Sequence, residues 1–288
     1  MKAARGTLFV ALALAIVLTA QAGTAGAVRA QIPAGTAEKG LAWESFLKSA
    51  EIVDSVQLSG PDATSRPWKL TLEKDGVRRF GLWKNIDTDE FGTPDRWRCE
   101  IAAYRFDRLT GLGLIPPTVE RRFNGEKGSL QLWIDDTDSL KKKTRAGETV
   151  PLERKPEWNR TAYLERAFDS LIADSDRNAN NILVTADWKI VLIDHSRSFR
   201  TDKPYAEKLM FGPEGLSRAA DGSPFPFLPL PRPFVERLKA IDFKTAKEAV
   251  KPYLNDREIR TALERAALIV RAVEKAAREG GESLAVYQ

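Results

Sequence analysis

Polar side chains gather in residues 174–181, directly before a short apolar run. This stretch reads Asp-Ser-Asp-Arg-Asn-Ala-Asn-Asn, and the apolar residues 182–184 follow it. A second apolar run, residues 190–193, ends in Asp194, and the short polar connection between the runs is typical of a hairpin. In an antiparallel hairpin, Asn181 and Asp194 lie at the same end, and carboxylate and amide oxygens are the ligands that magnesium prefers. The stretch therefore predicts a magnesium site. A polar turn before an ordinary hairpin is the alternative.

The elements around this hairpin fall into two groups. Upstream, alternating apolar residues predict strands over 52–58, 68–72, 77–84 and 128–134, and a helical period predicts one helix over 96–109. Downstream, the period predicts mainly helices, with long ones over 157–173 and 256–279. The fold class is therefore α+β, with a small β-rich lobe over 51–140 and a mainly helical lobe over 141–288. Irregular loops are expected over 87–95, 135–148 and 201–231, and the last of these is expected to border an acceptor site.

Composition excludes several function classes. The chain has 288 residues, of which 43% are hydrophobic and 30% are charged, as in globular proteins. The net charge of +5 comes from 45 basic and 40 acidic residues without a long basic run, so we expect no nucleic-acid partner. Cys99 is the only cysteine and His195 the only histidine, which excludes zinc sites built from Cys and His. Cys99 falls in the predicted helix, where we expect a small buried side chain rather than a nucleophile.

The first residues have the pattern of an export signal. Lys2 and Arg5 precede the apolar run Leu8–Ala20, and small residues follow at 22 and 27. This pattern predicts a signal peptide over residues 1–27, followed by a leader and an N-terminal helix over 28–50. The protein is then exported, to the periplasm or to the medium. It would contact a membrane only if the N-terminal segment stays uncleaved and anchors it.

Two motifs in the chemistry-bearing stretch resemble those of a known superfamily. Residues 176–181, Asp-Arg-Asn-Ala-Asn-Asn, are similar to the D-R-H-x-x-N motif of the atypical kinase-like superfamily, and residues 193–195 are similar to its I-D-F/N-G motif. This superfamily includes phosphatidylinositol kinases, HipA-type kinases and Golgi secretory-pathway kinases. Residues 100–118 resemble the helix and strand that follow the nucleotide-binding lysine. The resemblance spans residues 53–199 and implies a two-lobed protein-kinase-like fold.

The resemblance implies a role for each part of a phosphoryl-transfer site. ATP and Mg²⁺, for which Mn²⁺ could substitute, would be the cofactors. The nucleotide-binding residues would be Lys84, which reaches the phosphates, Glu100, which pairs with Lys84, and Thr64 and Ser65, which lie in a phosphate-covering turn. Asp176 would be the catalytic aspartate, and Asn181 and Asp194 would hold the metal. The alternatives are an exposed strand-end lysine for Lys84, a solvated glutamate for Glu100 and an Asx turn for Asp194.

The sequence departs from the family pattern at three places. Asn178 replaces the usual histidine, and His195 and Ser196 follow the metal aspartate without a glycine. The turn over residues 59–65 also lacks the usual glycine pattern. Asp174 and Arg177 are expected to have structural roles, with Arg177 paired to a carboxylate. His195 is expected to be a packing or hydrogen-bonding residue.

Three functions agree with these residues. The first is an exported, ATP- and Mg-dependent phosphotransferase that acts on a hydroxyl of a protein or sugar acceptor. The second is a pseudokinase-like module that binds a nucleotide or a partner without turnover. The third is transfer of a nucleotidyl group on the same fold. Only the first strictly requires Asp176 as a base.

Overall fold

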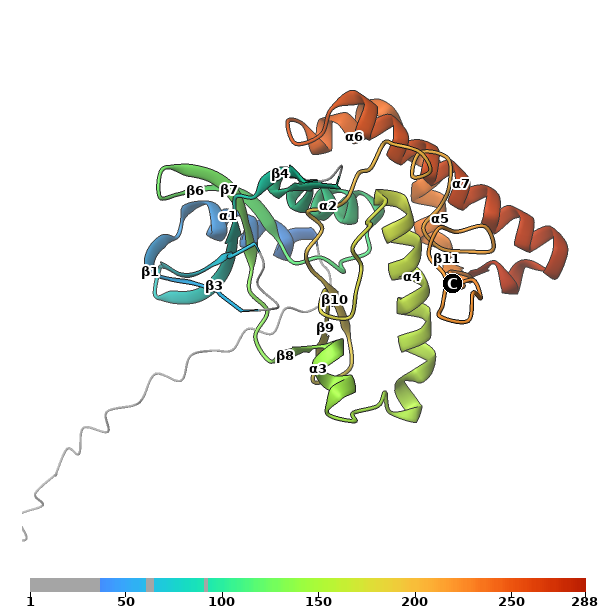
Figure 1. The fold of residues 1–288 in the computed structure, drawn as a ribbon, viewed down its shortest axis with the longest axis horizontal. Coiled ribbons are helices and arrows are strands. Elements are labelled where there is room, and N and C mark those ends of the chain that lie inside the picture. The colour runs from blue at the N-terminus through green and yellow to red at the C-terminus, as the bar shows by residue number, and fades with distance from the viewer. Residues whose placement is uncertain (1–36, 61–64, 91–92) are drawn as a thin grey trace, which may run out of the picture. The chain divides into compact units, whose positions relative to one another are not determined.

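The structure, a computed structural model, describes residues 37–60, 65–90 and 93–288 (Figure 1). These residues belong to one compact unit, Ile32–Gln288. The predicted signal peptide lies outside the described residues. Among the described helices, none is both long enough and apolar enough to cross a membrane.

A five-stranded antiparallel sheet forms the first half of the described chain. Its order is β1-β2-β3-β7-β6, with bounds Glu51–Gln57, Trp68–Lys74, Val77–Lys84, Glu126–Leu132 and Thr118–Phe123. Asp75 and Gly76 connect β2 to β3 and both have positive φ, as a tight hairpin requires. Helix α1 (Ala37–Ser49) packs Leu47 against the leucines and Trp83 of this sheet. The strands predicted from alternation are confirmed.

Helix α2 (Trp97–Thr110) joins a second, larger hydrophobic core. Its residues Cys99, Ala103 and Phe106 are buried together with residues of the C-terminal helices. Burial raises the pKa of the Cys99 thiol to about 12, so the thiol is protonated at neutral pH and a poor nucleophile. The expectation of a buried, unreactive Cys99 is confirmed.

The helices of the second half are α4 (Lys155–Ile172), α5 (Arg232–Ala240), α6 (Phe243–Val250) and α7 (Asp256–Gly280). Asn255 and Glu258 form a capping box that fixes the start of α7. Short 3₁₀ turns, Leu152–Arg154 and Glu282–Leu284, precede α4 and follow α7. The fold is α+β, with a β-sheet lobe followed by a helical lobe, as the sequence predicts.

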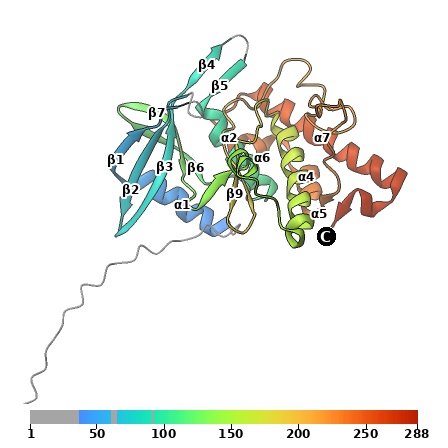
Figure 2. The ribbon, with the colours of Figure 1, turned by 60° about the horizontal axis from the view of Figure 1, so that its bottom comes forward.

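The predicted hairpin lies between the sheet and the helices (Figure 2). Strands β9 (Ile182–Thr185) and β10 (Ile190–Leu192) pair antiparallel, with Leu192 opposite Ile182. Leu192 also donates its backbone N–H to the carbonyl of Leu114, which ties the hairpin to the loop after α2. The polar residues before β9 and after β10 therefore lie side by side at the open end of the hairpin.

Two predicted loops contain regular structure, so these predictions were wrong. Strands β4 (Asp87–Glu90) and β5 (Thr93–Arg96) pair antiparallel as a second hairpin. Residues 137–145 form β8 (Thr137–Ser139), which extends the β9–β10 sheet, and α3 (Leu140–Arg145). In both places the residues are mostly polar, so no alternation of buried and exposed side chains marks them in the sequence.

The third predicted loop is irregular, as expected. Over residues 201–231 the structure has one isolated bridge and the two-residue strand β11 (Leu230–Pro231), which pairs with β12 (Val286–Tyr287). This segment and α7 line an open pocket of about 450 Å³ whose surface is mainly apolar, with Phe211, Phe225 and Leu268 among its lining residues.

A buried carboxylate organises the loop that leads from α2 into β6. Asp107 accepts hydrogen bonds from the backbone N–H groups of Gly113 (3.2 Å) and Leu114 (2.9 Å). Burial raises the pKa of Asp107 to about 7, although the amide bonds act in the opposite direction. The ionised form is therefore disfavoured in the folded protein at acidic pH.

The raised pKa of Asp107 predicts a pH-dependent stability. Because its folded-state pKa exceeds the usual 3.8, its contribution to the free energy of unfolding is largest below about pH 4 and is lost as the pH rises to about 7. We expect the difference in unfolding free energy between the wild type and Asp107→Asn to fall across this range by up to about 4 kcal/mol. Urea denaturation at several pH values measures it. A difference that is constant or rises with pH would contradict the assignment.

Candidate active site

Lys84, the last residue of β3, lies at the junction of the sheet, α2 and the hairpin. Its Nζ donates to Glu100 Oε1 at 2.7 Å and to Asp194 Oδ1 at 2.6 Å. Its side chain is only 8% exposed, which excludes a solvated strand-end lysine. Burial alone would lower the pKa of Lys84, but the two carboxylates raise it above its usual value. Lys84 is therefore a fixed point charge.

Glu100 stands one turn into α2 and faces inward. Its side chain is 4% exposed, which excludes the solvated alternative, and the predicted pair with Lys84 is present. Its second oxygen, Oε2, accepts the backbone N–H of His195 at 3.0 Å. Burial alone would raise the pKa of Glu100, whereas Lys84 and His195 lower it below its usual value. Glu100 thus stays ionised and fixes both Lys84 and the residue after Asp194.

Asp194 and Asn181 occupy the end of the hairpin, as predicted. The backbone N–H of Ile193 donates to the carbonyl of Asn181 at 3.1 Å, which sets the two positions side by side. Asp194 has a φ of 60° and is held at Oδ1 by Lys84 and Ser196, while its side chain remains 38% exposed. Asn181 donates its amide nitrogen to the carbonyl of Asp176, so its amide oxygen is left for another partner.

This donor set fits a hard divalent cation. One carboxylate and one amide oxygen, beside the half-exposed carboxylate of Asp176, are the oxygen ligands of magnesium sites, which retain several waters. When bound there, the ion would neutralise phosphate charge. Asn181 and Asp194 would hold it.

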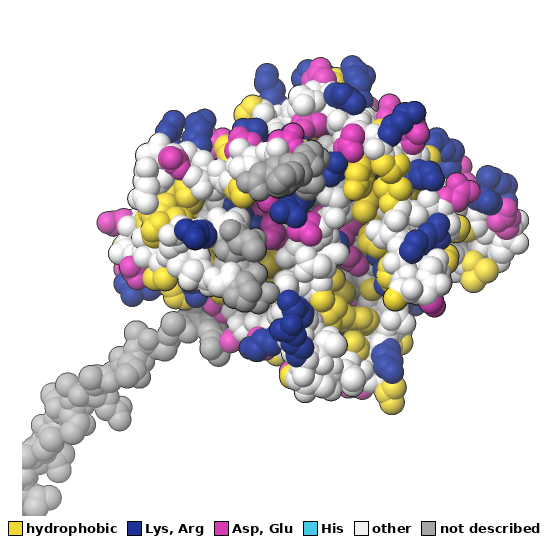
Figure 3. Space-filling model, in the orientation of Figure 1, with side chains coloured by type: hydrophobic (Ala, Val, Ile, Leu, Met, Phe, Trp, Pro, Cys, Tyr) yellow, Lys and Arg dark blue, Asp and Glu magenta, His cyan; other side chains and the backbone are white. Residues whose placement is uncertain are grey.

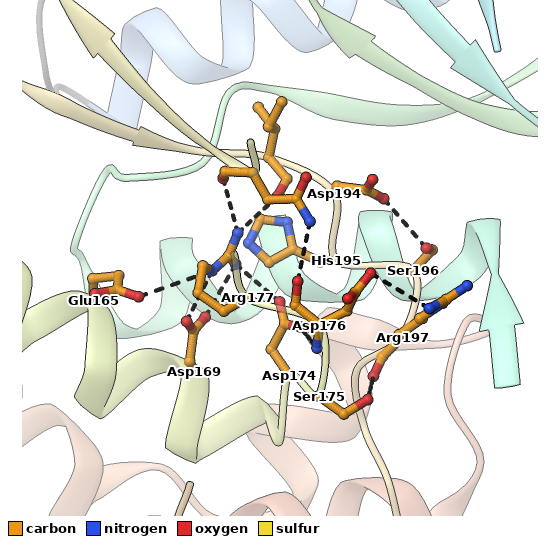
Figure 4. A network of polar contacts seen from close by, with 12 residues as sticks. Glu165, Asp169, Asp174, Ser175, Asp176, Arg177, Asp194, His195, Ser196 and Arg197 are labelled. Atoms are coloured by element: carbon orange, nitrogen blue, oxygen red, sulfur yellow. Dashed lines mark hydrogen bonds and ion pairs between the residues drawn. The ribbon is translucent and has the colours of Figure 1, made fainter. Parts of the chain in front are cut away.

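The loop that carries Asp176 is held by the buried cation Arg177 (Figure 4). Arg177 donates to Asp169 at 2.8 and 3.1 Å, to Asp174 at 2.9 Å, and to the carbonyls of Asn181 and Ile193. Burial lowers the pKa of Arg177, but the carboxylates raise it by more. The expected structural role of Arg177, paired with a carboxylate, is confirmed.

Asp174 follows the end of α4 and connects Arg177 to the catalytic candidate. Its Oδ1 accepts the backbone N–H of Asp176 at 3.0 Å. Burial raises the pKa of Asp174 to about 6, and Arg177 acts against that rise. Asp176 itself is 44% exposed, and burial raises the pKa of its carboxyl group while Arg197 lowers it. Asp176 therefore presents its carboxylate at the surface from a fixed backbone.

His195 is a packing residue. It is fully buried, its ring lies edge-on to Phe168, and its Nδ1 is 3.8 Å from Glu100 Oε2. Neither ring nitrogen has a hydrogen-bond partner among the described residues, which is costly for a buried polar group. His195 thus fills the space between α2 and α4 beside Glu100.

Of the predicted phosphate-covering turn, Ser65 lies near the end of the sheet that carries Lys84. Trp68, which follows this turn, pairs with Trp83 beside Lys84. Ser65 is half-buried in the turn. Thr64 lies outside the described residues, so its predicted role stays a prediction.

No sequence pattern predicts the contacts of Arg197. Its Nε donates to Asp95 Oδ2 at 3.2 Å, and its Nη1 lies 3.5 Å from Asp176 Oδ2. Asp95 belongs to the hairpin that was expected to be a loop. Acidic side chains gather on the face between the sheet and α4 (Figure 3).

Comparison with known proteins rests on the fold, because no model of a known protein family and no curated protein matches the sequence. A solved structure of the Golgi casein kinase aligns with 88% of this chain and 80% of its own, at 14% identity and a TM-score of 0.57. The chain therefore shares the kinase-like fold of this structure. The Helicobacter pylori proinflammatory kinase CtkA aligns with 77% of this chain and 92% of its own, at 11% identity and a TM-score of 0.48. The kinase-like fold agrees with the resemblance found in the sequence motifs.

The buried charges at the centre of this kinase-like fold predict a large cost for removing Lys84. In Lys84→Met, Glu100 is left buried without its cation, so we expect the free energy of unfolding to fall by about 3–5 kcal/mol. The double variant Lys84→Met/Glu100→Gln should be more stable than the single one, because it removes both charges. Denaturant unfolding measures both.

Lys142→Met is the matched control, since Lys142 is 72% exposed and pairs with Asp138. An exposed pair contributes about 0–1 kcal/mol. Equal effects of Lys84→Met and Lys142→Met would show that the buried network has no special energetic role.

Proposed function

We propose that this protein is an exported ATP- and Mg²⁺-dependent phosphotransferase that phosphorylates a hydroxyl of a protein or sugar acceptor. The observation that carries the proposal is the pair of ion pairs that Lys84 forms, one with Glu100 and one with Asp194. It joins a phosphate-binding cation to a metal-binding carboxylate at one point. Asp176 and Asn181 stand on the loop beside that point.

Each of these residues would have its own role in phosphoryl transfer. Lys84 would bind the phosphates as a fixed charge, and Asn181 and Asp194 would hold the metal that neutralises them. Asp176 would orient the acceptor hydroxyl and take its proton as the acceptor oxygen bonds to the γ-phosphorus. The bond from phosphorus to the β-phosphate oxygen breaks, and ADP leaves with that electron pair. The half-exposed Asp176 carboxylate suits this role, because an acceptor can reach it.

Labelled ATP tests the reaction class. The purified protein is incubated with Mg-ATP and an extract of exported proteins and glycans, with the label at the γ- or the α-phosphate. We expect label on an acceptor from γ-labelled ATP only. Label from the α-phosphate would instead indicate nucleotidyl transfer. Binding of Mg-ATP without transfer of either label would indicate a pseudokinase-like module.

Asp176→Asn tests the assignment of the base. Because the amide cannot accept the proton, we expect the transfer rate to fall by about 10²–10⁴-fold while Mg-ATP affinity is retained. Asp187→Asn is the control, since Asp187 is 46% exposed in the hairpin turn and pairs with Lys189. Full activity of Asp176→Asn would exclude Asp176 as the base.

The proposal of export rests on the N-terminal pattern of Lys2, Arg5 and the apolar run Leu8–Ala20. When the chain is expressed with its own N-terminus, we expect a mature form that begins after Ala22 or Ala27, outside the cytoplasm. Intact mass and N-terminal sequencing measure this. A full-length chain in the membrane fraction would instead indicate an uncleaved anchor, and a full-length chain in the cytoplasm would contradict export.

A further inference from the structure

Arg197 places a cation directly beside the catalytic candidate. Its Nη1 lies 3.5 Å from Asp176 Oδ2, and its side chain is 40% exposed (Figure 4). Its backbone is fixed, because the carbonyl of Arg197 accepts both the N–H (3.4 Å) and the Oγ–H (3.0 Å) of Ser175. The preceding carbonyl, that of Ser196, accepts the N–H of Arg96 at 2.9 Å. A rigid backbone therefore carries an accessible guanidinium at the site.

The Arg197 guanidinium has N–H groups that are not used in strong hydrogen bonds. Its Nε bonds to one oxygen of Asp95, and the distance from Nη1 to Asp176 exceeds that of a strong hydrogen bond. Its Nη2 makes no hydrogen bond to the described residues. By contrast, Lys84 is held by two carboxylates, and Arg177 is 5% exposed and bonded to Asp169 and Asp174. Of these three cations, Arg197 has the most exposed side chain.

The negative charge of the site favours a cation at this position. The site holds three aspartates: Asp95 and Asp176 pair with Arg197, and Asp194 pairs with Lys84. A bound triphosphate would add further negative charge. In phosphoryl transfer the charge is spread over the three equatorial oxygens of the group in flight. The acceptor oxygen would be hydrogen-bonded to Asp176 and in line with the γ-phosphorus. The equatorial phosphoryl oxygens then lie within reach of Arg197, whose Nη1 is 3.5 Å from the same carboxylate.

We propose that Arg197 is a further catalytic residue, whose guanidinium binds the oxygens of the phosphoryl group as it passes to the acceptor. This inference rests on the proposed function. Arg197 forms no covalent bond and moves no proton. The acceptor oxygen bonds to phosphorus, the bond to the β-phosphate oxygen breaks with its electron pair on ADP, and the acceptor proton goes to Asp176. Asp95 holds Arg197 at its Nε while the other nitrogens donate to the phosphoryl oxygens.

The experiment measures transfer of label from γ-labelled Mg-ATP to the acceptor in the extract of exported proteins and glycans, for the full chain and its variants. The rate at saturating Mg-ATP gives an apparent kcat. We expect Arg197→Ala to lower kcat by about 100-fold or more, because it removes a donor to the transition state. The Kd for Mg-ATP, from calorimetry, should stay close to that of the wild type. Methylguanidine should restore part of the rate of Arg197→Ala and leave the wild type unchanged. The kcat of Arg197→Lys should lie between those of the wild type and Arg197→Ala. Lysine keeps the positive charge but lacks the planar guanidinium that donates two parallel hydrogen bonds.

Arg98→Ala is the matched control, because Arg98 is 38% exposed and pairs with Asp87 of the same β4–β5 hairpin. We expect it to keep the wild-type rate and show no response to methylguanidine. A wild type that transfers no label to any acceptor overturns the proposed function, and this inference with it. An active wild type with a fully active Arg197→Ala overturns the inference alone. A loss of rate that methylguanidine does not restore also overturns it and leaves Arg197 with a structural role.

Discussion

The ion pairs of Lys84 with Glu100 and Asp194 are the interaction on which the rest of the structure depends. The three residues come from β3, α2 and the end of the β9–β10 hairpin, and Lys84 and Asp194 are 110 residues apart in sequence. Lys84 and Glu100 are almost fully buried, and buried charges persist only when they are paired. The sheet, the helix and the hairpin therefore meet at one point, and α2 packs into the larger core while it reaches the sheet lobe.

A second buried cation fixes the residues that would act on an acceptor. The loop over residues 174–181 has no regular secondary structure, yet Arg177 ties it to α4 and to both strands at the open end of the hairpin. Asp174 adds a bond to the backbone of Asp176. The polar cluster in this sequence thus has two layers. The buried layer holds the loop in place, and the side chains of the second layer, Asp176, Asp194 and Arg197, are partly exposed to solvent.

Local pattern predicted most of the fold and the contents of the site. The hairpin, the strands of the large sheet, α2, α4 and α7 are marked by apolar periodicity, and the pairing of Lys84 with Glu100 follows from motif order. The β4–β5 hairpin and α3 are polar and leave no such mark. The contacts of Arg197 with Asp95 and of Arg96 with Glu258 join residues 102 and 162 positions apart, so only the folded chain reveals them. The full burial of His195 depends on packing between α2 and α4, which no local pattern encodes.

Calorimetric titration with ATP, in the presence and absence of Mg²⁺, tests most directly whether this junction is a nucleotide site. We expect the wild type to bind Mg-ATP, to bind ATP more weakly without the metal, and to lose the effect of the metal in Asp194→Asn. Asp187→Asn, in the exposed turn of the same hairpin, should bind as the wild type does. A wild type that binds no nucleotide, or an Asp194→Asn variant that binds Mg-ATP with wild-type affinity, would contradict the account.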